Sequence, residues 1–439
     1  MKYEAEILRI LEEEIIPAEG CTEPIAIAYA ASLCADCLGE AGNADAKTRV
    51  LPDKVDVFLS GNMIKNVKSV HIPSSQGRTG IEFAVGMGLL LGKSSEKLMV
   101  ISGADSSRLG EVEEYVKRGT IKIHHETSCP KLYIRIETES GCDRCIVEIK
   151  DFHTNITRLE VNGKPAEGLH SGGCDSIKET YTSRDFLTID RICNAARKID
   201  LSKIEPLFDE VIEKNSAIAR EGLKNVYGIA IGKTIWDGIA EGSYGNDIRN
   251  NLAAFAAAGS DARMNGCPLP VMTTSGSGNQ GMTCSLPIIR FCQMKSLSHE
   301  QMIRGLFFSH LCTIHIKESI GRLSAYCGAM AASAAVAGAL AFLDGLGNDK
   351  VKMAVETTLA TVSGVICDGA KSSCATKICT GITMAVDAYF AARSSRGLSF
   401  GEGIVGEDVE TTIDYVGELG SEGMQTTDEV ILDIMLQNK

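Results

Sequence analysis

The sixteen cysteines of this 439-residue chain are the side chains that could serve as metal ligands or catalytic groups. Cys327 begins an alanine-rich segment that we expect to be helical, and Cys367 and Cys374 flank the glycine-containing loop CDGAKSSC. Three thiolates that converge from a helix and a neighbouring loop could ligate three irons of a 4Fe-4S cluster and leave the fourth iron open. The 39 and 6 intervening residues fit no ferredoxin pattern, so buried core thiols are the other interpretation of this spacing.

Two CxxC pairs offer another metal chemistry, because zinc is commonly bound by cysteines at this spacing. The pair at 34–37 lies in an alanine-rich predicted helix, where packing in the core is the expected role. The pair at 142–145 lies at a predicted hairpin turn, and Cys129 with His124 or His125 could complete four zinc ligands. A structural zinc site is therefore an open alternative.

A glycine-rich polar segment, TTSGSGNQG at 273–281, interrupts the most apolar part of the chain. Between residues 251 and 290 the only charged side chains are Asp261, Arg263 and Arg290. Glycines permit close backbone approach, and backbone N–H groups can bind a carboxylate, so the segment suits a small zwitterionic ligand. An ordinary connection between two helices explains the pattern equally well. The candidate ligand-binding residues are Ser275, Gly276, Ser277, Gly278, Asn279 and Gln280.

A second loop, HIPSSQGRTG at 71–80, precedes an apolar segment with helical periodicity. Serine and glycine at the start of a helix can bind an anion through backbone N–H groups, which makes Ser75 a candidate contact. A simple helix cap requires the same residue types. Ser75 is therefore a weaker candidate than the 273–281 segment.

The elements that must position these residues are of two kinds. Apolar residues recur at helical spacing over 1–45, strand-like alternation dominates 46–170, and from about 184 onward every long periodic segment is helical. We therefore expect an α+β protein. A large all-α catalytic domain at 171–439 would carry an inserted smaller α+β domain at 46–170, and the helices of 1–45 would pack with the catalytic domain. The expected strands are 55–60, 121–126, 131–138, 145–150 and 156–161.

Composition restricts the class of partner. The net charge is −13 and aromatic residues make up 5% of the chain, which disfavours nucleic acid and an anionic membrane surface as partners. The uncharged stretch 323–343 has the length of a membrane span, but its many alanines favour a buried helix. The acidic start of the chain is unlike a signal peptide, so we expect a cytoplasmic protein with reduced thiols. An apolar helical domain of this size is compatible with a homo-oligomer.

Five separated motifs carry a family resemblance. They are EGCTEP at 19–24, SGN at 60–62, PLPVMTTSGSGNQG at 268–281, SHLCTIHIKESIGRLSAYCG at 309–328 and GVICDGAKSSC at 364–374. In this order they resemble the L-cysteine desulfidase family, which is related to the α-chain of iron–sulfur L-serine dehydratases. The resemblance extends from about residue 10 to residue 395, nearly the whole chain.

The resemblance implies an oxygen-sensitive 4Fe-4S enzyme that converts L-cysteine to pyruvate, ammonia and sulfide by β-elimination. Carried over by motif, Cys327, Cys367 and Cys374 become the cluster ligands, with one iron left open, and Cys21 becomes the active-site cysteine. In related serine dehydratases a C-terminal cysteine can cap the fourth iron. No cysteine follows Cys379 here, so that cap is not expected.

A base must remove the Cα proton of the substrate. Cys21, as a thiolate whose pKa is lowered by the cluster region or by a helix start, is the first candidate. Lys317, in IHIKES, is the second. Alternatively, Cys21 is a buried thiol, and Lys317 is a solvated helix residue or forms an ion pair with Glu318 or Glu356.

The identity of the amino-acid substrate stays open at this stage. Its carboxylate is expected at the 275–280 segment, with Asn62 and Ser75 as weaker contacts. The chain reads PSSQGRTG at 73–80, where the family usually has a PGTG-like turn. The same machinery could act on L-serine, although the softness of a thiolate favours L-cysteine. A zinc-stabilised binding protein without lyase activity is the alternative from another class.

Overall fold

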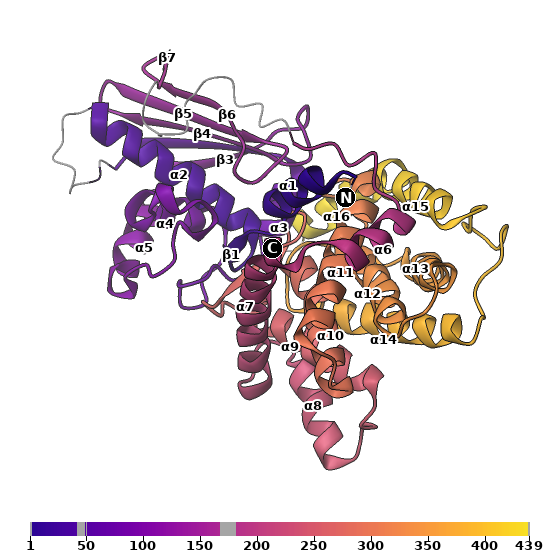
Figure 1. Ribbon diagram of the computed structural model, residues 1–439. Helices are drawn as coiled ribbons and strands as arrows, with labels where there is room; N and C mark the ends of the chain where they lie inside the picture. Colours follow the sequence, from indigo (N-terminus) through magenta and orange to yellow (C-terminus); the bar gives the residue numbers. More distant parts are fainter. Residues whose placement is uncertain (1, 42–48, 50, 167–180, 438–439) are drawn as a thin grey trace.

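A computed structural model of the chain describes residues 2–41, 49, 51–166 and 181–437. A sheet-containing part and a helical part lie side by side (Figure 1). The structure confirms the predicted α+β class, because a six-stranded mixed sheet forms near the N-terminus and most of the later chain is helical. Both predicted domain boundaries, after residues 45 and 170, lie outside the described residues and stay predictions.

The sheet has the strand order β3-β2-β4-β5-β6-β7. Strand β2 runs parallel to β3, and the other neighbouring strands are antiparallel. All five predicted strands are present, with ends within two residues of the expected ones. The strands are β2 (Lys54–Leu59), β3 (Ile121–His125), β4 (Tyr133–Ser140), β5 (Asp143–Lys150), β6 (Ile156–Val161) and the short β7 (Lys164–Pro165).

Helices cover one face of this sheet in successive layers. Alternation puts Val55, Val57 and Leu59 of β2 in the core. Helix α2 (Thr22–Ala41) packs on β4 and β5, α4 (Ile81–Leu91) packs on α2, and α5 (Leu109–Lys117) packs on α4 (Figure 1).

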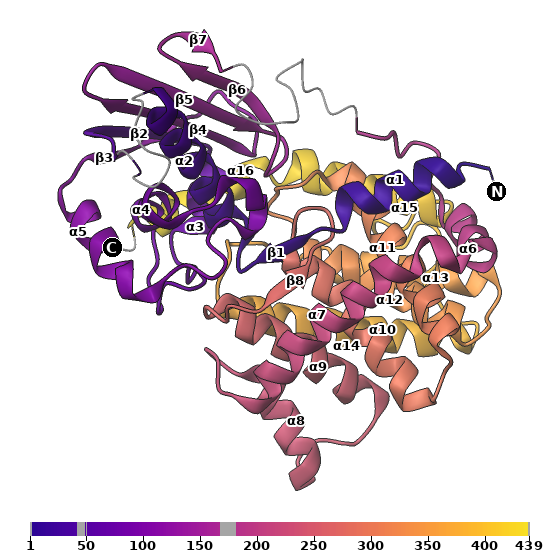
Figure 2. The ribbon, with the colours of Figure 1, turned by 60° about the vertical axis from the view of Figure 1, so that its left-hand side comes forward.

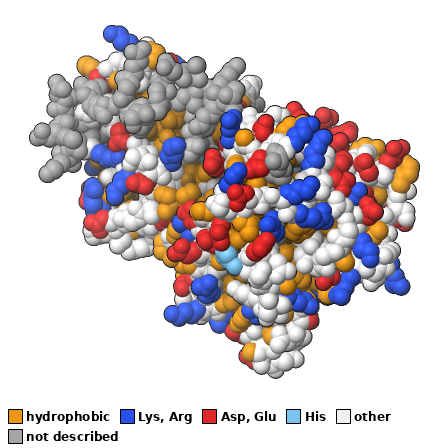
Figure 3. Space-filling view, in the orientation of Figure 1, with side chains coloured by type: hydrophobic (Ala, Val, Ile, Leu, Met, Phe, Trp, Pro, Cys, Tyr) orange, Lys and Arg blue, Asp and Glu red, His pale blue; other side chains and the backbone are white. Residues whose placement is uncertain are grey.

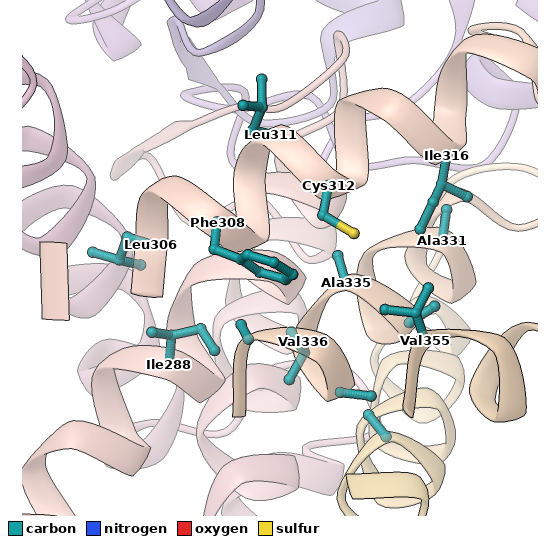
Figure 4. Close-up of a cluster of buried hydrophobic side chains, with 14 of the residues drawn as sticks. Ile288, Leu306, Phe308, Leu311, Cys312, Ile316, Ala331, Ala335, Val336 and Val355 are labelled. Atoms are coloured by element: carbon teal, nitrogen blue, oxygen red, sulfur yellow. The ribbon is translucent and has the colours of Figure 1, made fainter. Parts of the chain in front are cut away.

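The helical part is built around the alanine-rich helix α12 (Gly328–Leu343), which is buried along most of its length. Its small side chains let α11 (His299–Ile320), α13 (Asn348–Val362) and α14 (Ser373–Arg393) approach closely. In Figure 4, Cys312 points from α11 toward Ala335 of α12. The predicted buried helix at 323–343 is confirmed, although it starts only at Gly328. Among the described residues, no helix has both the length and the apolar character needed to cross a membrane.

The prediction missed some helices. Helix α10 begins inside the glycine-rich segment because Ser277 caps it, with its hydroxyl accepting a hydrogen bond from the Gln280 N–H. Helix α16 lies in a tail that looks polar, but Leu432 packs on the sheet side. The remaining helices are α1 (Glu4–Glu14), α3 (Gly61–Val67), α6 (Ile189–Lys198), α7 (Glu205–Lys224), α8 (Ile231–Glu241), α9 (Ile248–Met264), α10 (Gly278–Lys295), α15 (Val409–Glu418) and α16 (Gln425–Gln437).

Buried apolar side chains form two large clusters, one in each part. Helix α1 contributes to the helical cluster, whereas the buried apolar side chains of α2 belong to the sheet cluster. The apolar face of α1 thus packs with the helical part, and that of α2 packs with the sheet. Acidic and basic side chains are interspersed over the face in Figure 3.

Candidate active site

A short antiparallel pair of strands joins the sheet-containing part to the helical part, next to the candidate site. Strand β1 (Pro17–Glu19) pairs with β8 (Pro270–Met272), so that Glu19 lies opposite Pro270 (Figure 2). The residues that follow each strand are thereby brought together. The hydroxyl of Thr22 donates to the carbonyl of Gly276 at 2.9 Å.

Four helix N-termini converge on a cavity of about 100 Å³ beside this pair of strands. Cys21 directly precedes α2, Ser277 caps α10, Cys327 precedes α12, and Cys374 lies in the first turn of α14. All of these residues line the cavity. Because helix N-termini carry partial positive charge, the arrangement suits anionic groups such as thiolates and a carboxylate.

Cys327, at the start of the alanine-rich helix, and Cys367 and Cys374, at the two ends of the CDGAKSSC loop, meet in this cavity as free thiols. Backbone hydrogen bonds fix their loops: Cys327 N–H donates to Val365, and Cys367 N–H donates to Ala325. Burial raises the pKa of Cys327 to about 12 and that of Cys374 to about 11, and the charge of Cys367 adds to both. The metal-free cavity therefore favours the protonated thiols of Cys327 and Cys374.

The donor set fits an iron–sulfur cluster better than a single metal ion. Within the described chain, the three Sγ atoms do not all lie within 4.8 Å of one another. Tetrahedral zinc with 2.3 Å bonds would place its sulfur ligands about 3.8 Å apart. In a 4Fe-4S cluster each thiolate binds a separate iron, so a wider set of three soft thiolates is suitable.

The predicted zinc ligands are not brought together. Cys129 interacts electrostatically with Tyr133 at the start of β4, whereas Cys145 on β5 lies opposite Thr138. These positions are separated by about 17 Å along the strand. The zinc prediction is therefore wrong, because Cys129 precedes β4 whereas Cys145 lies beside the other half of that strand, and these side chains form no group of metal-binding size within the described residues.

Cys21 is a buried thiol that donates to Glu23 Oε2 at 2.9 Å. Burial and the charge of Glu23 raise the pKa of Cys21 well above its ordinary value. The predicted lowering of this pKa is wrong for the protein by itself, although Cys21 lies at a helix start. Burial alone would also raise the pKa of Glu23, but nearby His153 and the hydrogen bond from Cys21 lower it to about 2.

Lys317 reaches the same cavity from α11 and donates to the carbonyl of Gly321 at 2.5 Å. Burial lowers its pKa to about 8, although two cavity thiols act in the opposite direction. In the described part of the chain, Lys317 forms no ion pair with Glu318 or Glu356. A buried amine that titrates near neutral pH has the properties of a general base.

Most of the residues predicted to bind the substrate carboxylate lie at this cavity, and two lie elsewhere. Ser275, Gly276, Ser277, Asn279 and Gln280 line the cavity, and Gly278 lies behind them. The glycine-rich segment is thus the connection from a strand into a helix, not a loop between two helices.

Asn62 and Ser75 do not line this cavity. Asn62 borders a different one, and Ser75 closes its own turn by accepting from Arg78 N–H and donating to the Ile72 carbonyl. Asn66, one turn after Asn62 on α3, lines the site instead and donates to Glu23 Oε1 at 3.0 Å.

Several polar atoms on the cavity wall have no hydrogen-bond partner in the described chain. A buried polar group without a partner costs about 1–3 kcal/mol, so a group of them around one cavity indicates a missing ligand. Apart from Gln280, sequence reasoning missed their residues, although Arg263 stood out as one of three charges between 251 and 290. The atoms are Asn66 Oδ1, Arg263 Nε and both polar side-chain atoms of Gln280.

A larger cavity of about 520 Å³ adjoins the first and shares Ser275, Lys317, Arg322 and Leu323 with it. Arg322 lies between them, with its guanidinium 3.9 Å from the centre of the Phe152 ring. It also donates to Glu14 at 2.6 Å. A small polar molecule could reach the inner cavity past this arginine.

Comparison with known proteins shows the family of the chain. Residues 80–433 match the family described as the serine dehydratase alpha chain. The chain is 53% identical to UPF0597 protein FN1147 of Fusobacterium nucleatum over 431 residues, which is 98% of each chain. It is 40% identical over 430 residues to a UPF0597 protein of Lachnoclostridium phytofermentans, covering 98% of this chain and 99% of that one. The motifs at 268–281, 309–328 and 364–374 lie within residues 80–433, and the similarity to the two relatives extends over the motifs at 19–24 and 60–62 as well.

Proposed function

Because the chain belongs to the UPF0597 family and to the serine dehydratase alpha-chain family, we propose that it is an iron–sulfur-dependent carbon–sulfur lyase. Its reaction would be the β-elimination of L-cysteine to pyruvate, ammonia and sulfide. One observation carries the proposal: Cys327, Cys367 and Cys374 line the same cavity as Cys21, Lys317 and the α10 N-terminus. A reducing cytoplasm would keep these thiols available.

The three cysteines would hold a 4Fe-4S cluster, which when bound supplies an iron that acts as a Lewis acid toward the leaving sulfur. The N-termini of α12 and α14 would stabilise the thiolate forms of Cys327 and Cys374. Lys377, a cation that interacts electrostatically with Cys327 and Cys374, adds to this stabilisation.

Lys317 is the better candidate for the base, because its pKa is about 8 while that of Cys21 is raised. Its neutral amine would take the Cα proton, and the C–H electrons would form the Cα–Cβ double bond as the Cβ–S bond breaks. Sulfide leaves, and the resulting 2-aminoacrylate tautomerises and is hydrolysed to pyruvate and ammonia. Cys21, hydrogen-bonded to ionised Glu23, would remain a thiol beside the substrate.

L-Serine is the second candidate substrate, because the family match is to serine dehydratases. It would undergo the same elimination with loss of hydroxide. The preference for L-cysteine rests on the affinity of soft thiolate ligands for iron of this kind.

The test is anaerobic reconstitution with iron and sulfide, followed by assays of sulfide and pyruvate. L-Cysteine should yield both products in equal amounts, faster than L-serine yields pyruvate. Equal or faster turnover of L-serine would replace the desulfidase assignment by a serine dehydratase. A reconstituted protein that turns over neither amino acid would refute the lyase proposal.

A further inference from the structure

Arg263 is a buried cation without a direct partner. It lies in the last turn of α9 and is 2% exposed. Within the part of the chain that the structure describes, it forms no hydrogen bond and no ion pair, and its Nε is fully enclosed. Arg184, also buried at 7% exposure, contrasts with it, because Arg184 donates to Glu13, Glu14 and a backbone carbonyl. Removing an unpaired charge from water costs several kcal/mol, so a counter-ion is expected at Arg263.

Gly278 brings this guanidinium to the N-terminus of α10. A Cβ atom at position 278 would lie only 2.5 Å from Arg263 Nε, so a glycine is needed for the contact. Helix α10 runs for 18 residues from Gly278, and the first N–H groups of a helix have no partner within it. A buried unpaired cation and a helix N-terminus therefore meet on one wall of the cavity.

The nearest carboxylate is already engaged by other donors. Glu23 accepts hydrogen bonds from Cys21, Thr22 and Asn66, and its effect on Arg263 is only a longer-range attraction. An anionic ligand in the cavity would supply the counter-ion that Arg263 lacks within the described chain. A carboxylate matches the planar fork of a guanidinium and can accept two parallel hydrogen bonds from it.

We propose that Arg263, together with the α10 N-terminus, binds the α-carboxylate of the substrate. This inference deepens the proposed function and rests on it for the identity of the substrate. It defines the substrate class as small thiol or hydroxy amino acids with a free carboxylate. Simple aminothiols without a carboxylate are excluded from this class.

Calorimetry on the anaerobically reconstituted protein tests the inference with two matched probes. 3-Mercaptopropionate carries the thiol and the carboxylate, and cysteamine carries the thiol and the amine. Arg263→Gln should weaken 3-mercaptopropionate binding by about 100-fold and change cysteamine binding by less than threefold. Arg263→Lys keeps the charge but loses the fork, and should weaken 3-mercaptopropionate binding by about tenfold.

Equal weakening of both probes by these variants would overturn the inference and make Arg263 a counter-charge for the thiolates. Unchanged binding of 3-mercaptopropionate would overturn it as well. If Arg263→Gln does not fold, Arg263→Lys alone gives the ratio between the probes. The probes bind without turnover, so a failure of the lyase assay and a failure of carboxylate recognition are separate results.

Discussion

Among the described residues, two groups of three cysteines can be compared, and they differ in their surroundings. The cavity triad consists of Cys327, Cys367 and Cys374. The core triad consists of Cys34 and Cys37 on α2 and Cys145 on β5. Members of the core triad are at most 2% exposed, and Cys145 contacts both of the others. Thiol proximity is therefore common to both groups, whereas the core triad is fully buried and Cys367 and Cys374 of the cavity triad are only partly buried.

The neighbours of each triad decide what its thiols can do. The core triad belongs to the apolar cluster beneath the sheet, and Cys34 donates weakly to the Ile136 carbonyl. In the cavity triad, Cys327 and Cys374 lie at helix N-termini and Cys367 lies in the loop before α14, and all three lie beside Lys317 and unpartnered polar atoms. Cysteine spacing without this context could not separate the two, because CxxC at 34–37 is the more familiar metal pattern.

The largest expected effect on iron content and turnover comes from replacing one cysteine of the cavity triad by alanine, with the same replacement in the core triad as its control. Cys374→Ala should abolish bound iron and labile sulfide and lower the turnover of L-cysteine more than a thousandfold, because it removes one of three ligands. The matched variant Cys145→Ala should retain iron and turnover and lose only about 1–2 kcal/mol of unfolding free energy through a small cavity. Iron analysis and denaturant titration give these readouts. Loss of iron from Cys145→Ala as well would erase the distinction between the triads.

Local patterns predicted much of the fold. Alternating residues located all five longer strands, and helical periodicity showed that the chain is helical from about residue 184 onward. Helices α10 and α16 were missed because a glycine-rich start and a polar composition hide their apolar faces. Tertiary contacts stabilise both helices: α10 packs against α12, and α16 packs against α3.

The site was predictable only where a motif contained it. The cavity triad, Cys21 and Lys317 lie in motifs that the sequence displays. Asn66 and His153 come from elements whose pairing with the cavity depends on the sheet and on the β1–β8 ladder. Spacing cannot report such long-range contacts, which explains why Asn62 was chosen and Asn66 was overlooked.

A buried ion pair braces the cavity triad and provides the next prediction. Lys65, whose side chain is 1% exposed, donates to Asp428 at 2.5 Å and to the Cys367 carbonyl at 3.2 Å. Asp428 also accepts from the Ala325 N–H. Gly369 packs on the Lys65 carbonyl, where a Cβ would lie at 2.4 Å. The pair thus holds both cysteine-bearing loops from α3 and α16.

Lys65→Met should lower the unfolding free energy by about 3–5 kcal/mol, because it leaves Asp428 buried without its partner. Iron retention should fall in parallel, since the Cys367 loop loses a donor. Lys203→Met, which breaks the exposed pair between Lys203 and Glu4, is the control and should leave both properties nearly unchanged. Denaturant titration and iron analysis of the two variants check this. Full iron retention by Lys65→Met would contradict the bracing role.

Lys317 lies beside the cavity triad, and the protonation of its amine can be followed in the metal-free protein through the pH dependence of stability. Its pKa is about 8 in the fold and about 10.4 when unfolded, so the unfolded chain binds more protons between these values. Stability should therefore rise with pH from about 8 to 10.4, by up to roughly 3 kcal/mol, relative to Lys317→Met. Below pH 8 the whole destabilising contribution is present. Denaturation of both proteins at pH 7.5 and 10 measures the difference, and thiol titrations common to both cancel.

The smallest effects are expected from residues outside the cavity. Ser75→Ala should cost about 1 kcal/mol of unfolding free energy, because it loses hydrogen bonds within its turn, and should leave KM for L-cysteine within twofold. Asn62→Ala should change KM equally little. Asn66→Ala, one turn along the same helix, removes a donor to Glu23 and should lower kcat about tenfold. A KM that rises for Asn62→Ala while Asn66→Ala stays normal would move the substrate to the cavity beside α16, away from the cysteines that define the proposed chemistry.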